Sequence, residues 1–472
     1  MLQEIQSIKN SDPLELIRRS DVISFDVFDT AIIRPFLHHH ETYFIVEKLL
    51  KFHKFHKIRI KAEKFTRKEL IHKTHAKEEV TILDIYEHIH INKQQAINTE
   101  ISFDIEICRQ RKFIYKLYQF AVNLGKTIIF TTDITYPKKA IEQLLHKNGY
   151  TFYKNIYVSS EENLSKHQGG IYKKIILDMK ISPHKILHIG DSIKADIQQA
   201  RQHKIRSLYV PRPYHDLCKH INHNQFQVRK NALNSSLFAA SSNVIFNNLS
   251  FKIERKHLIT MPLLFKMSRV VSQTKNNIFL INEALPNTLY HIFREIYQHF
   301  TTERIIIIEI NVSKLYASSV RTFEDLVNIK QILSENEFRK FILNHYNIEK
   351  VELEELQTQW GEIEFLSMQI RKNTMESIQH LKNFTIYDFT FNNNTKIFIQ
   401  NILNCVMPSF YAIDSILKRN IQKETRRTLT GKPKAEELIN EMQTLTNEET
   451  QRYIIPQVHY FFNTLGKHTE LL

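Results

Sequence analysis

Residues 22–30 read VISFDVFDT, and this stretch decides the fold of the chain. Its first four residues form a short, β-prone apolar run, which is typical of a buried strand in a parallel sheet. Asp26 follows at the carboxyl end of this predicted strand. Ligands of open α/β sheets bind outside the carboxyl ends of the strands, so a carboxylate at this position can reach a substrate.

Two later stretches have the same form. Residues 127–130 read TIIF and are followed by Thr131-Thr132-Asp133, while residues 185–189 read KILHI and are followed by Gly190-Asp191. Each stretch predicts a buried strand that ends on polar side chains. Because the carboxyl ends of parallel strands share one edge of a sheet, we expect these side chains to meet there.

Taken in order, Asp26, Thr132, Lys166 and the Gly190-Asp191 pair resemble the motifs of the haloacid dehalogenase-like superfamily. The pattern of that family is a nucleophilic Asp after one strand, a Ser or Thr after another, a Lys, and an acidic Gly-Asp motif. The resemblance implies an α/β fold with a Rossmann-like, doubly wound parallel sheet at its core. It also implies a site for phosphoryl transfer.

The same resemblance implies roles for individual residues. Asp26 would be the nucleophile that accepts the phosphoryl group, and Thr30 would hold the loop that follows it. Thr132 would hydrogen-bond a phosphoryl oxygen, with Thr131 beside it at the substrate. Lys166 has the family's spacing from the Ile-Tyr pair that follows it, and it would neutralise charge on the nucleophile and on the phosphate.

A Mg²⁺ site is also implied by the resemblance. Asp26, Asp191 and the backbone carbonyl of Phe28 would bind the ion, and Asp196 would support them. A carboxylate can attack phosphorus only when a metal and a cation offset the repulsion between two anions. Electrostatic stabilisation of the phosphoryl oxygens then does most of the catalytic work.

Phe28 departs from the phosphatase pattern, in which a second Asp two positions after the nucleophile serves as general acid and base. Phenylalanine cannot move a proton. Asp29 or another residue substitutes for the missing acid, or the leaving group departs unaided, or hydrolysis is slow. Asp29 stands where Gly is frequent in the family, and capping the following turn is an equally simple interpretation of it.

Between the first two predicted strands lies a segment of about a hundred residues, which is far too long for a plain strand connection. Its apolar residues recur at helical spacing, so residues 37–117 are predicted to be an inserted helical cap and residues 1–36 and 118–225 the catalytic core. Glu79 to Tyr86 and Thr132 to Pro137 resemble predicted hydrolases of bacterial surface-polysaccharide gene clusters.

The predicted cap contains the densest basic stretch of the chain, from Lys51 to Lys77. Most of these lysines are expected on a solvated helix face. Arg59 and Arg67 are the candidates to contact substrate, because a guanidinium group matches phosphate with two parallel hydrogen bonds.

Composition limits the remaining possibilities. The chain has 472 residues, a formal net charge of +15 and 3 cysteines without metal-ligand or redox spacing. These features predict several domains, a reducing cytoplasmic environment and a surface that attracts anions, such as nucleotides or lipid headgroups. No apolar run is long enough for a transmembrane span and no signal-peptide pattern follows Met1, although export that needs no signal peptide stays open. No motif for specific nucleic-acid recognition is visible.

The second half of the chain carries fewer signals. Residues 226–250 are rich in Ser, Asn and Ala and predict a linker or an irregular connection. A strand, helix and strand over 278–310 predict a βαβ unit within a second domain, residues 251–417, that is α/β or mostly helical. Residues 418–472 are expected to be a charged, helical tail.

The sequence favours a Mg²⁺-dependent hydrolase that acts on a small phosphorylated metabolite, either a sugar phosphate or a nucleotide, through an aspartyl phosphate on Asp26. One alternative is a catalytically weakened domain that binds phosphorylated ligands or partners. Another is a surface-polysaccharide enzyme or a secreted effector whose chemistry lies partly in the C-terminal half. The sequence specifies neither the substrate nor the oligomeric state.

Overall fold

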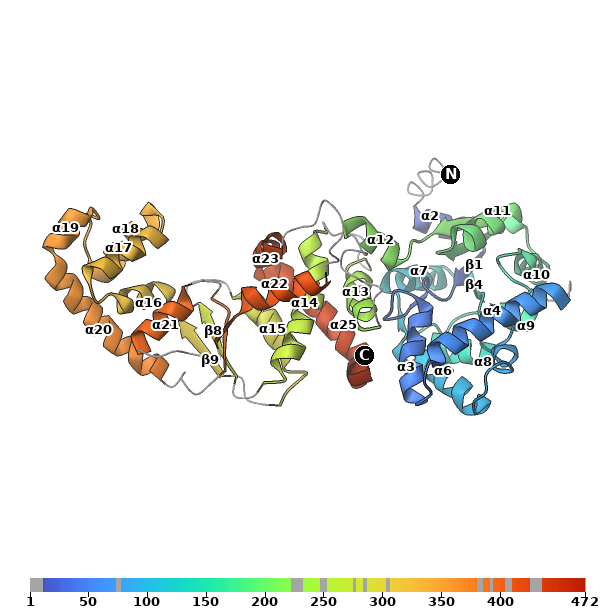
Figure 1. Ribbon diagram of the computed structural model, residues 1–472. Helices are drawn as coiled ribbons and strands as arrows, with labels where there is room; N and C mark the ends of the chain where they lie inside the picture. The colour runs from blue at the N-terminus through green and yellow to red at the C-terminus, as the bar shows by residue number, and fades with distance from the viewer. Residues whose placement is uncertain are drawn as a thin grey trace. The chain divides into compact units, whose positions relative to one another are not determined.

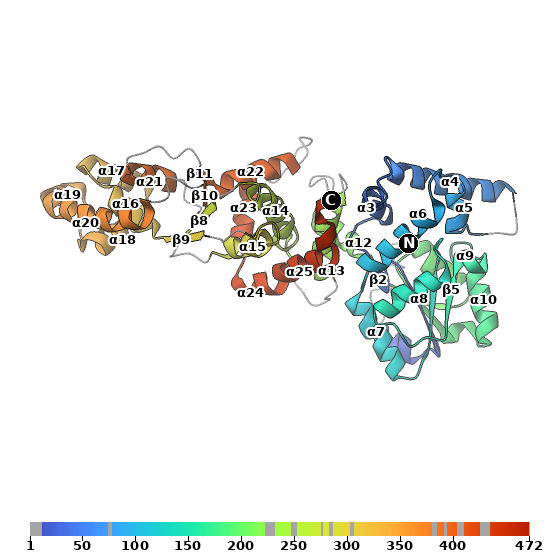
Figure 2. The same ribbon diagram turned by 90° about the horizontal axis from the view of Figure 1, so that it is seen from below.

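The computed structural model describes residues 12–73, 78–221, 232–246, 253–274, 277–282, 287–302, 306–379, 385–390, 394–403, 410–424 and 435–471. The chain forms two compact units, the first made of Met1–Pro262 with Pro456–Leu472 and the second of Leu263–Ile455. Figures 1 and 2 show the helices and strands of both units in two orientations. Among the helices of the described ranges, none is both long and apolar enough to cross a membrane.

The first unit is built on a five-stranded parallel sheet of order β5-β4-β1-β6-β7. Its strands are β1 (Val22–Asp26), β4 (Thr127–Thr132), β5 (Asn155–Val158), β6 (Ile186–Gly190) and β7 (Arg206–Tyr209). The three strands predicted from the sequence are therefore its three central strands. Every residue of β1 and β6 is buried, as expected for a parallel sheet with both faces covered.

Helices on both sides of the sheet belong to the same unit. They are α2 (Pro13–Arg18), α7 (Lys112–Asn123), α8 (Lys138–Lys147), α9 (Ser159–Glu162), α10 (Gly170–Met179), α11 (Gln199–Gln202) and α12 (Pro213–His220), with the short helical turns η2 (Pro183–Lys185) and η3 (Ile193–Gln198). The predicted α/β class, with a parallel sheet at its core, is confirmed.

Helices fill the long segment between β1 and β4. They are η1 (His39–Glu41), α3 (Thr42–Leu49), α4 (Phe55–Lys73), α5 (Ile82–Tyr86) and α6 (Lys93–Ile107), and we call them the cap. The small antiparallel pair β2 (Ile32–Ile33) and β3 (Arg109–Gln110) stands where the chain enters and leaves the cap. Helix α7 contacts α2 and β4, so it belongs with the core although the sequence analysis ended the cap within it, at residue 117.

The prediction of an irregular linker over 226–250 was wrong for most of that segment, since α13 runs over Ala232–Ile245. Its Ser, Ala and Asn side chains are nearly all buried. Small side chains let a helix approach its neighbours closely, and serine hydroxyls can bond to carbonyls one turn back, as Ser241 does to Leu237. The ends of the predicted linker, 226–231 and 247–250, lie outside the described residues.

The predicted charged tail also needs correction. Helix α25 (Ile455–Leu465) has the buried residues Val458, Phe461 and Leu465, and η6 (Gly466–Leu471) follows it. From Pro456 onward these residues belong to the first unit, where Gln457 accepts a hydrogen bond from Ser241 of α13 at 2.8 Å. The final segment is therefore part of a core and not a solvated extension.

The second unit contains a four-stranded parallel sheet of order β11-β10-β8-β9. The predicted strand-helix-strand unit is present as β8 (Asn277–Asn282), α15 (Thr288–Tyr297) and β9 (Ile306–Ile310), and β10 (Thr385–Asp388) and β11 (Phe410–Ala412) complete the sheet. The other helices are α14 (Arg255–Val271), which begins in the first unit, α16 (Val312–Ser319), α17 (Phe323–Ile332), α18 (Glu335–Tyr346), α19 (Leu353–Thr358), α20 (Trp360–Ile378), α21 (Thr395–Leu403), α22 (Ile413–Glu424), α23 (Ala435–Gln443), α24 (Asn447–Glu449) and η5 (Thr450–Ile454). The second half is thus α/β.

Candidate active site

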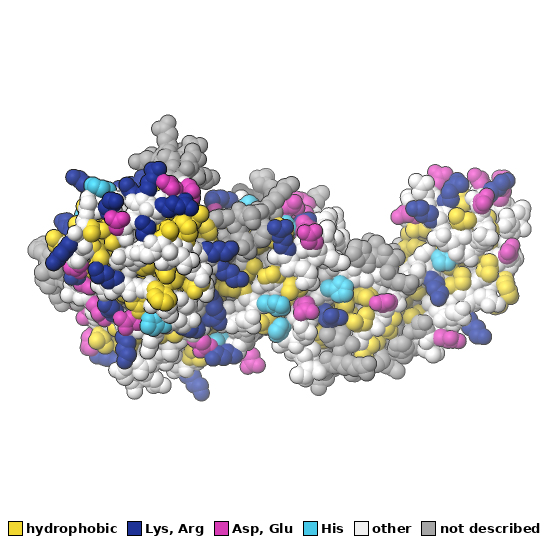
Figure 3. All heavy atoms as spheres, turned by 180° about the vertical axis from the view of Figure 1, so that it is seen from behind, with side chains coloured by type: hydrophobic (Ala, Val, Ile, Leu, Met, Phe, Trp, Pro, Cys, Tyr) yellow, Lys and Arg dark blue, Asp and Glu magenta, His cyan; other side chains and the backbone are white. Residues whose placement is uncertain are grey.

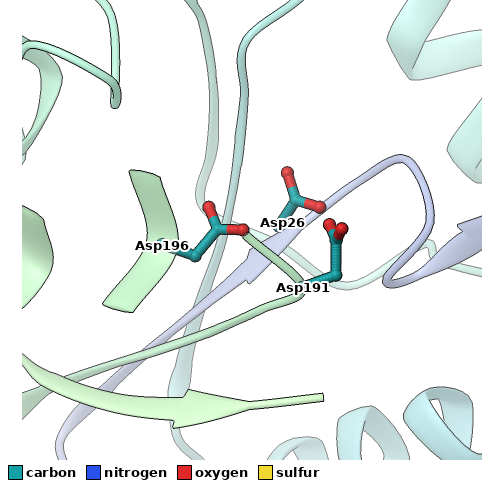
Figure 4. A group of neighbouring side chains, drawn as sticks. All are labelled: Asp26, Asp191 and Asp196. Carbon is teal, nitrogen blue, oxygen red and sulfur yellow. The ribbon is translucent and has the colours of Figure 1, made fainter. Parts of the chain in front are cut away.

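Three acidic side chains meet at the carboxyl edge of the first sheet. Asp26 is the last residue of β1, Asp191 follows β6, and Asp196 lies in η3. Figure 4 shows the three side chains turned toward one another, and carboxylate oxygens of all three lie within 4.8 Å. All three residues are buried. Like charges at this spacing, away from water, require cations to offset their repulsion.

Glycine at position 190 allows this close approach. A Cβ atom on Gly190 would lie 2.4 Å from the Cγ of Asp196, so any other residue would push that carboxylate away. Asp196 is also held by its own turn, because the backbone N–H of Ser192 donates to its Oδ2 at 2.8 Å. The Gly-Asp motif therefore has a packing reason as well as a chemical one.

Lys166 supplies the central positive charge. Its Nζ lies 2.5 Å from Oδ1 of Asp26 and 2.6 Å from Oδ1 of Asp196. Its backbone N–H donates to Asp133 at 2.8 Å, which holds the loop between α9 and α10 in place. Although burial opposes it, the two carboxylates raise the pKa of Lys166 well above its ordinary value, so the ammonium group stays charged.

Asp196 is satisfied by protein donors alone. Besides Lys166 and Ser192, it accepts a hydrogen bond from Nε2 of His188 at 3.1 Å. Nδ1 of His188 lies 2.8 Å from the hydroxyl of Ser24, which in turn lies 2.9 Å from the hydroxyl of Thr131. Burial acts to raise the pKa of Asp196, but Lys166 and His188 lower it overall, below its ordinary value. Asp196 is therefore an ionised group that positions Lys166.

The negative charges of the other two carboxyl groups, those of Asp26 and Asp191, are less fully offset by neighbouring cations. Burial raises the pKa of Asp26 well above its ordinary value, although Lys166 acts to lower it. Burial and the neighbouring Asp29 raise the pKa of Asp191 to about 6, although Arg212 acts to lower it. A buried carboxylate with too little compensation gains from an added cation.

Arg212 is a site residue that the sequence analysis missed. Its Nε donates to Asp191, and its Nη1 lies 3.4 Å from Oδ2 of Asp29. Asp29 adopts a left-handed backbone conformation with φ of 61°, which is uncommon for a residue other than glycine. Asp29 thus forms a salt bridge with Arg212 at the rim of the site. No sequence motif around Arg212 predicts that it pairs with Asp29 and Asp191.

The side chain of Phe28 is covered by a second missed residue, Arg34. The guanidinium carbon of Arg34 lies 3.9 Å from the centre of the Phe28 ring. Arg34 also forms a buried ion pair with Asp104 of α6, with 2.8 Å between Nη2 and Oδ2. The hydroxyl of Tyr136 donates to the same carboxylate at 3.0 Å.

A cavity of about 310 Å³ lies between this edge of the sheet and the cap. From the core it is lined by Asp26, Phe28, Asp29, Thr132, Lys166, Asp191, Asp196 and Arg212, and from the segment leading to the cap by Arg34. Residues of the cap itself, including Arg67 and Glu63 of α4, form the opposite wall. The predicted catalytic and metal-ligating residues thus face one cavity.

Two predicted substrate contacts lie elsewhere. Arg59 is 1% exposed and forms a bidentate pair with Glu100 at 2.8 and 2.9 Å, so its guanidinium group joins α4 to α6 inside the cap. The side chain of Thr131 points into the Ser24 and His188 chain. Neither residue lines the cavity, which argues against direct substrate contact, whereas Arg67 and Thr132 do line it. Thr30 lies 3.4 Å from Asp191, in the loop region that it was expected to hold.

The donor set suits a hard divalent cation. Mg²⁺ prefers oxygen ligands and is commonly held by one or two carboxylates. Within the described residues, Oδ1 of Asp26 contacts Lys166 while Oδ2 has no hydrogen-bond partner, and Asp191 is a second carboxylate, paired with Arg212 rather than with Lys166. We conclude that Asp26 and Asp191 fit a Mg²⁺ ion, with Asp196 supporting them from behind.

The chain was compared with protein-family models, curated proteins and solved structures. No family model and no curated protein match the chain. A haloacid dehalogenase-like family hydrolase from Xanthomonas campestris is similar in structure over 41% of this chain and 82% of its own, with 14% identity and a TM-score of 0.29. CbbY from Rhodobacter sphaeroides in complex with xylulose-(1,5)-bisphosphate is similar over 41% of this chain and 86% of its own, with 16% identity and a TM-score of 0.30. The putative HAD-hydrolase YfnB from Bacillus subtilis bound to magnesium is similar over 40% of this chain and 86% of its own, with 15% identity and a TM-score of 0.28.

Proposed function

We propose that the first unit is a Mg²⁺-dependent hydrolase of the haloacid dehalogenase type that transfers a phosphoryl group to Asp26. One observation carries the proposal. The Asp26 carboxylate faces a cavity at the carboxyl edge of a parallel sheet, together with the ammonium group of Lys166 and the carboxylates of Asp191 and Asp196. A nucleophile, a cation and oxygen ligands for a metal are the parts that this chemistry needs.

The residues of the chain have separable tasks in this proposal. A carboxylate oxygen of Asp26 forms a bond to phosphorus while the bond to the leaving oxygen breaks, and water later releases the phosphate from Asp26. Lys166 holds Asp26 in position and offsets negative charge on the phosphoryl oxygens. The hydroxyl of Thr132 donates a hydrogen bond to one of these oxygens. When bound, Mg²⁺ would neutralise charge that develops on the phosphoryl group.

The substrate of the proposal is a small phosphorylated metabolite, a sugar phosphate or a nucleotide. The cavity of about 310 Å³ is at the small end of ligand pockets. Arg67 of the cap would contact the part of the substrate that is remote from the phosphoryl group. The resemblance of the cap to hydrolases from surface-polysaccharide gene clusters favours a sugar. A cytoplasmic location remains part of the proposal.

The experiment is a screen of sugar phosphates and nucleotides for phosphate release, with and without Mg²⁺, for the native chain and for Asp26→Asn. We expect Mg²⁺-dependent release that falls at least about a thousandfold in the variant, because no other group replaces the nucleophile. Asp178→Asn is the matched control, since Asp178 is an exposed aspartate on α10. Turnover that survives in Asp26→Asn would contradict the proposal.

A second candidate function is binding of a phosphorylated ligand without turnover. It is favoured by Phe28, which cannot carry a proton, and by the engagement of Asp191 with Arg212. Calorimetric binding of a phosphorylated metabolite that the chain does not hydrolyse, even with Mg²⁺, would support this candidate over the first.

A further inference from the structure

The place where a general acid is expected holds an apolar ring with a guanidinium group over it. Phe28 stands two residues after the nucleophile, and the guanidinium group of Arg34 lies over its ring, 3.9 Å from the centre. Arg34 is 7% exposed, and both its side chain and Phe28 line the cavity with Asp26. The apolar ring and the cation thus occupy this wall of the site together.

The guanidinium group is held so that part of it remains available. Nε and Nη2 of Arg34 donate to Asp104 at distances of 2.8 to 3.3 Å, and the hydroxyl of Tyr136 fixes the same carboxylate. Nη1 donates to no residue in the part of the chain that the structure describes. A buried, oriented N–H donor at a cavity wall is the kind of group that stabilises a developing oxyanion.

Arg34 cannot itself give up a proton. Although burial acts in the opposite direction, Asp104 raises the pKa of Arg34 well above its ordinary value. It can donate a hydrogen bond, but it cannot protonate a leaving group. The lack of a proton donor limits which substrates can react, because an alkoxide leaving group needs a proton whereas a stable anion does not.

Two other groups on the cavity wall, Asp29 and Tyr136, are already engaged by protein partners. Asp29 forms an ion pair with Arg212. Burial raises the pKa of Tyr136 well above its ordinary value, and its hydroxyl already donates to Asp104.

We propose that the site releases phosphate from leaving groups that depart as stable anions, and that Arg34 stabilises the departing oxygen. The substrate class is acyl phosphates, phosphoanhydrides and esters of acidic alcohols, in contrast to alkyl phosphates. This inference rests on the proposed function, since it assumes that Asp26 is the nucleophile.

The chemistry balances without an acid from the protein. An oxygen of Asp26 bonds to phosphorus, the bond between phosphorus and the leaving oxygen breaks, and its electron pair leaves with that oxygen. Nη1–H of Arg34 donates a hydrogen bond to the oxygen as negative charge grows on it. Water then bonds to phosphorus, the bond to Asp26 breaks to restore its carboxylate, and the protons of the water leave with the phosphate product and to solvent. The second step also needs no acid, because the aspartyl phosphate is itself an acyl phosphate.

The experiment measures kcat/KM with Mg²⁺ for acetyl phosphate, 4-nitrophenyl phosphate, phenyl phosphate and glycerol phosphate. For the native chain we expect the values to fall in that order as the leaving group becomes more basic. Arg34→Gln should lower them by about a hundredfold, the loss expected for an oxyanion donor, and more for phenyl than for 4-nitrophenyl phosphate. The matched control is Arg18→Gln, which removes a cation from over the ring of Phe120, at 5.2 Å, on an exposed part of α2.

Two results would overturn the inference. One is a native chain that turns over glycerol phosphate as fast as acetyl phosphate. The other is an Arg34→Gln variant that loses activity equally on all four substrates, which would mark a structural role. If the variant does not fold, the native series decides alone. In every case Asp26→Asn is run in parallel: activity that depends on Asp26 but not on the leaving group removes this inference alone, whereas activity independent of Asp26, or none at all, removes the proposed function too.

Discussion

Asp191 shows how burial prepares a single side chain for a metal. Burial and Asp29 raise the pKa of its carboxyl group to about 6, although Arg212 lowers it in part. A proton and a cation then compete for the same oxygens, because a metal binds the ionised form. The affinity of the metal-free site for Mg²⁺ therefore depends on pH within a range that is easily measured.

We expect Mg²⁺ affinity to fall by about tenfold or more per pH unit as the pH drops below 6, because the carboxyl groups of Asp191 and Asp26 both have raised pKa values and bind protons in place of the ion. Titration calorimetry between pH 5 and 7.5 measures this directly. Asp191→Asn should bind Mg²⁺ weakly at all these values. An affinity that is unchanged between pH 7 and 5 would show that Asp191 is not a ligand.

Asp26 predicts an opposite effect of one substitution on stability and on turnover. Its pKa is higher in the folded chain than in the unfolded chain, mainly because of burial, so the carboxyl binds a proton more tightly when folded. At neutral pH its ionisation therefore costs folding free energy. We expect Asp26→Asn to be as stable as the native chain or about 1 kcal/mol more stable, although it is inactive. Urea denaturation at pH 7 tests this, and a clear loss of stability would contradict it.

Much of the candidate site could be predicted from the sequence. Arg34 and Arg212 could not, because their roles depend on contacts between residues that are distant along the chain. Asp26, Thr132 and Asp191 end β-prone apolar runs, so local pattern places them at one edge. Arg34 and Arg212 act through partners that are distant along the chain, Asp104 and Asp191, and no local pattern records such pairs.

At the scale of elements, the cap depends on one buried ion pair between α4 and α6. Arg59 and Glu100 are 1% and 2% exposed, and Tyr86 of α5 donates to Glu100 at 2.7 Å. From the sequence, Arg59 is predicted to contact phosphate because arginine suits phosphate. The same forked donor suits a carboxylate equally well, and only the fold distinguishes the two.

We expect Arg59→Ala to destabilise the cap by about 3–5 kcal/mol, because Glu100 would keep a buried charge without its cation. Thermal unfolding and proteolysis within the cap measure the effect. Lys61→Ala is the matched control on the same helix, since Lys61 is exposed, and it should change stability by about 0.5 kcal/mol or less. Equal effects of both substitutions would show that the ion pair between Arg59 and Glu100 does not stabilise the cap.

Helix α13 shows that composition alone does not distinguish a linker from a buried helix. Segments rich in Ser, Asn and Ala are typical of linkers, but here the same residues are buried and bonded. The N–H of Leu37 donates to Ser235 at 2.9 Å, and Asn243 donates to the backbone carbonyl of Arg34 at the same distance. Burial of polar side chains is set by neighbours, which a sequence pattern does not name.

At the scale of the whole molecule, segments far apart in the chain complete the first unit. Gln457 of α25 accepts from Ser241 at 2.8 Å and donates to the carbonyl of His257 at 2.7 Å, and the residue is fully buried. On the face that Figure 3 shows, basic side chains are interspersed with acidic and apolar ones.

We expect Gln457→Ala to destabilise the first unit by about 1–3 kcal/mol, because it removes two buried hydrogen bonds, one from Ser241 and one to the carbonyl of His257. Chemical denaturation measures the loss. His459→Ala, an exposed position on the same helix, serves as the control and should have little effect. If the two variants are equally stable, the contacts of Gln457 do not hold α25 in place.

Because Pro456–Leu472 belongs to the first unit, the order of synthesis matters. At roughly 5–20 residues per second, a ribosome needs on the order of ten seconds or more to make the second unit before α25 emerges. During that interval the nascent first unit exposes the side of α13 that carries Ser241 and Asn243, which α25 later covers. A chain that stalls within the second unit would keep that surface uncovered and open to chaperones and proteases.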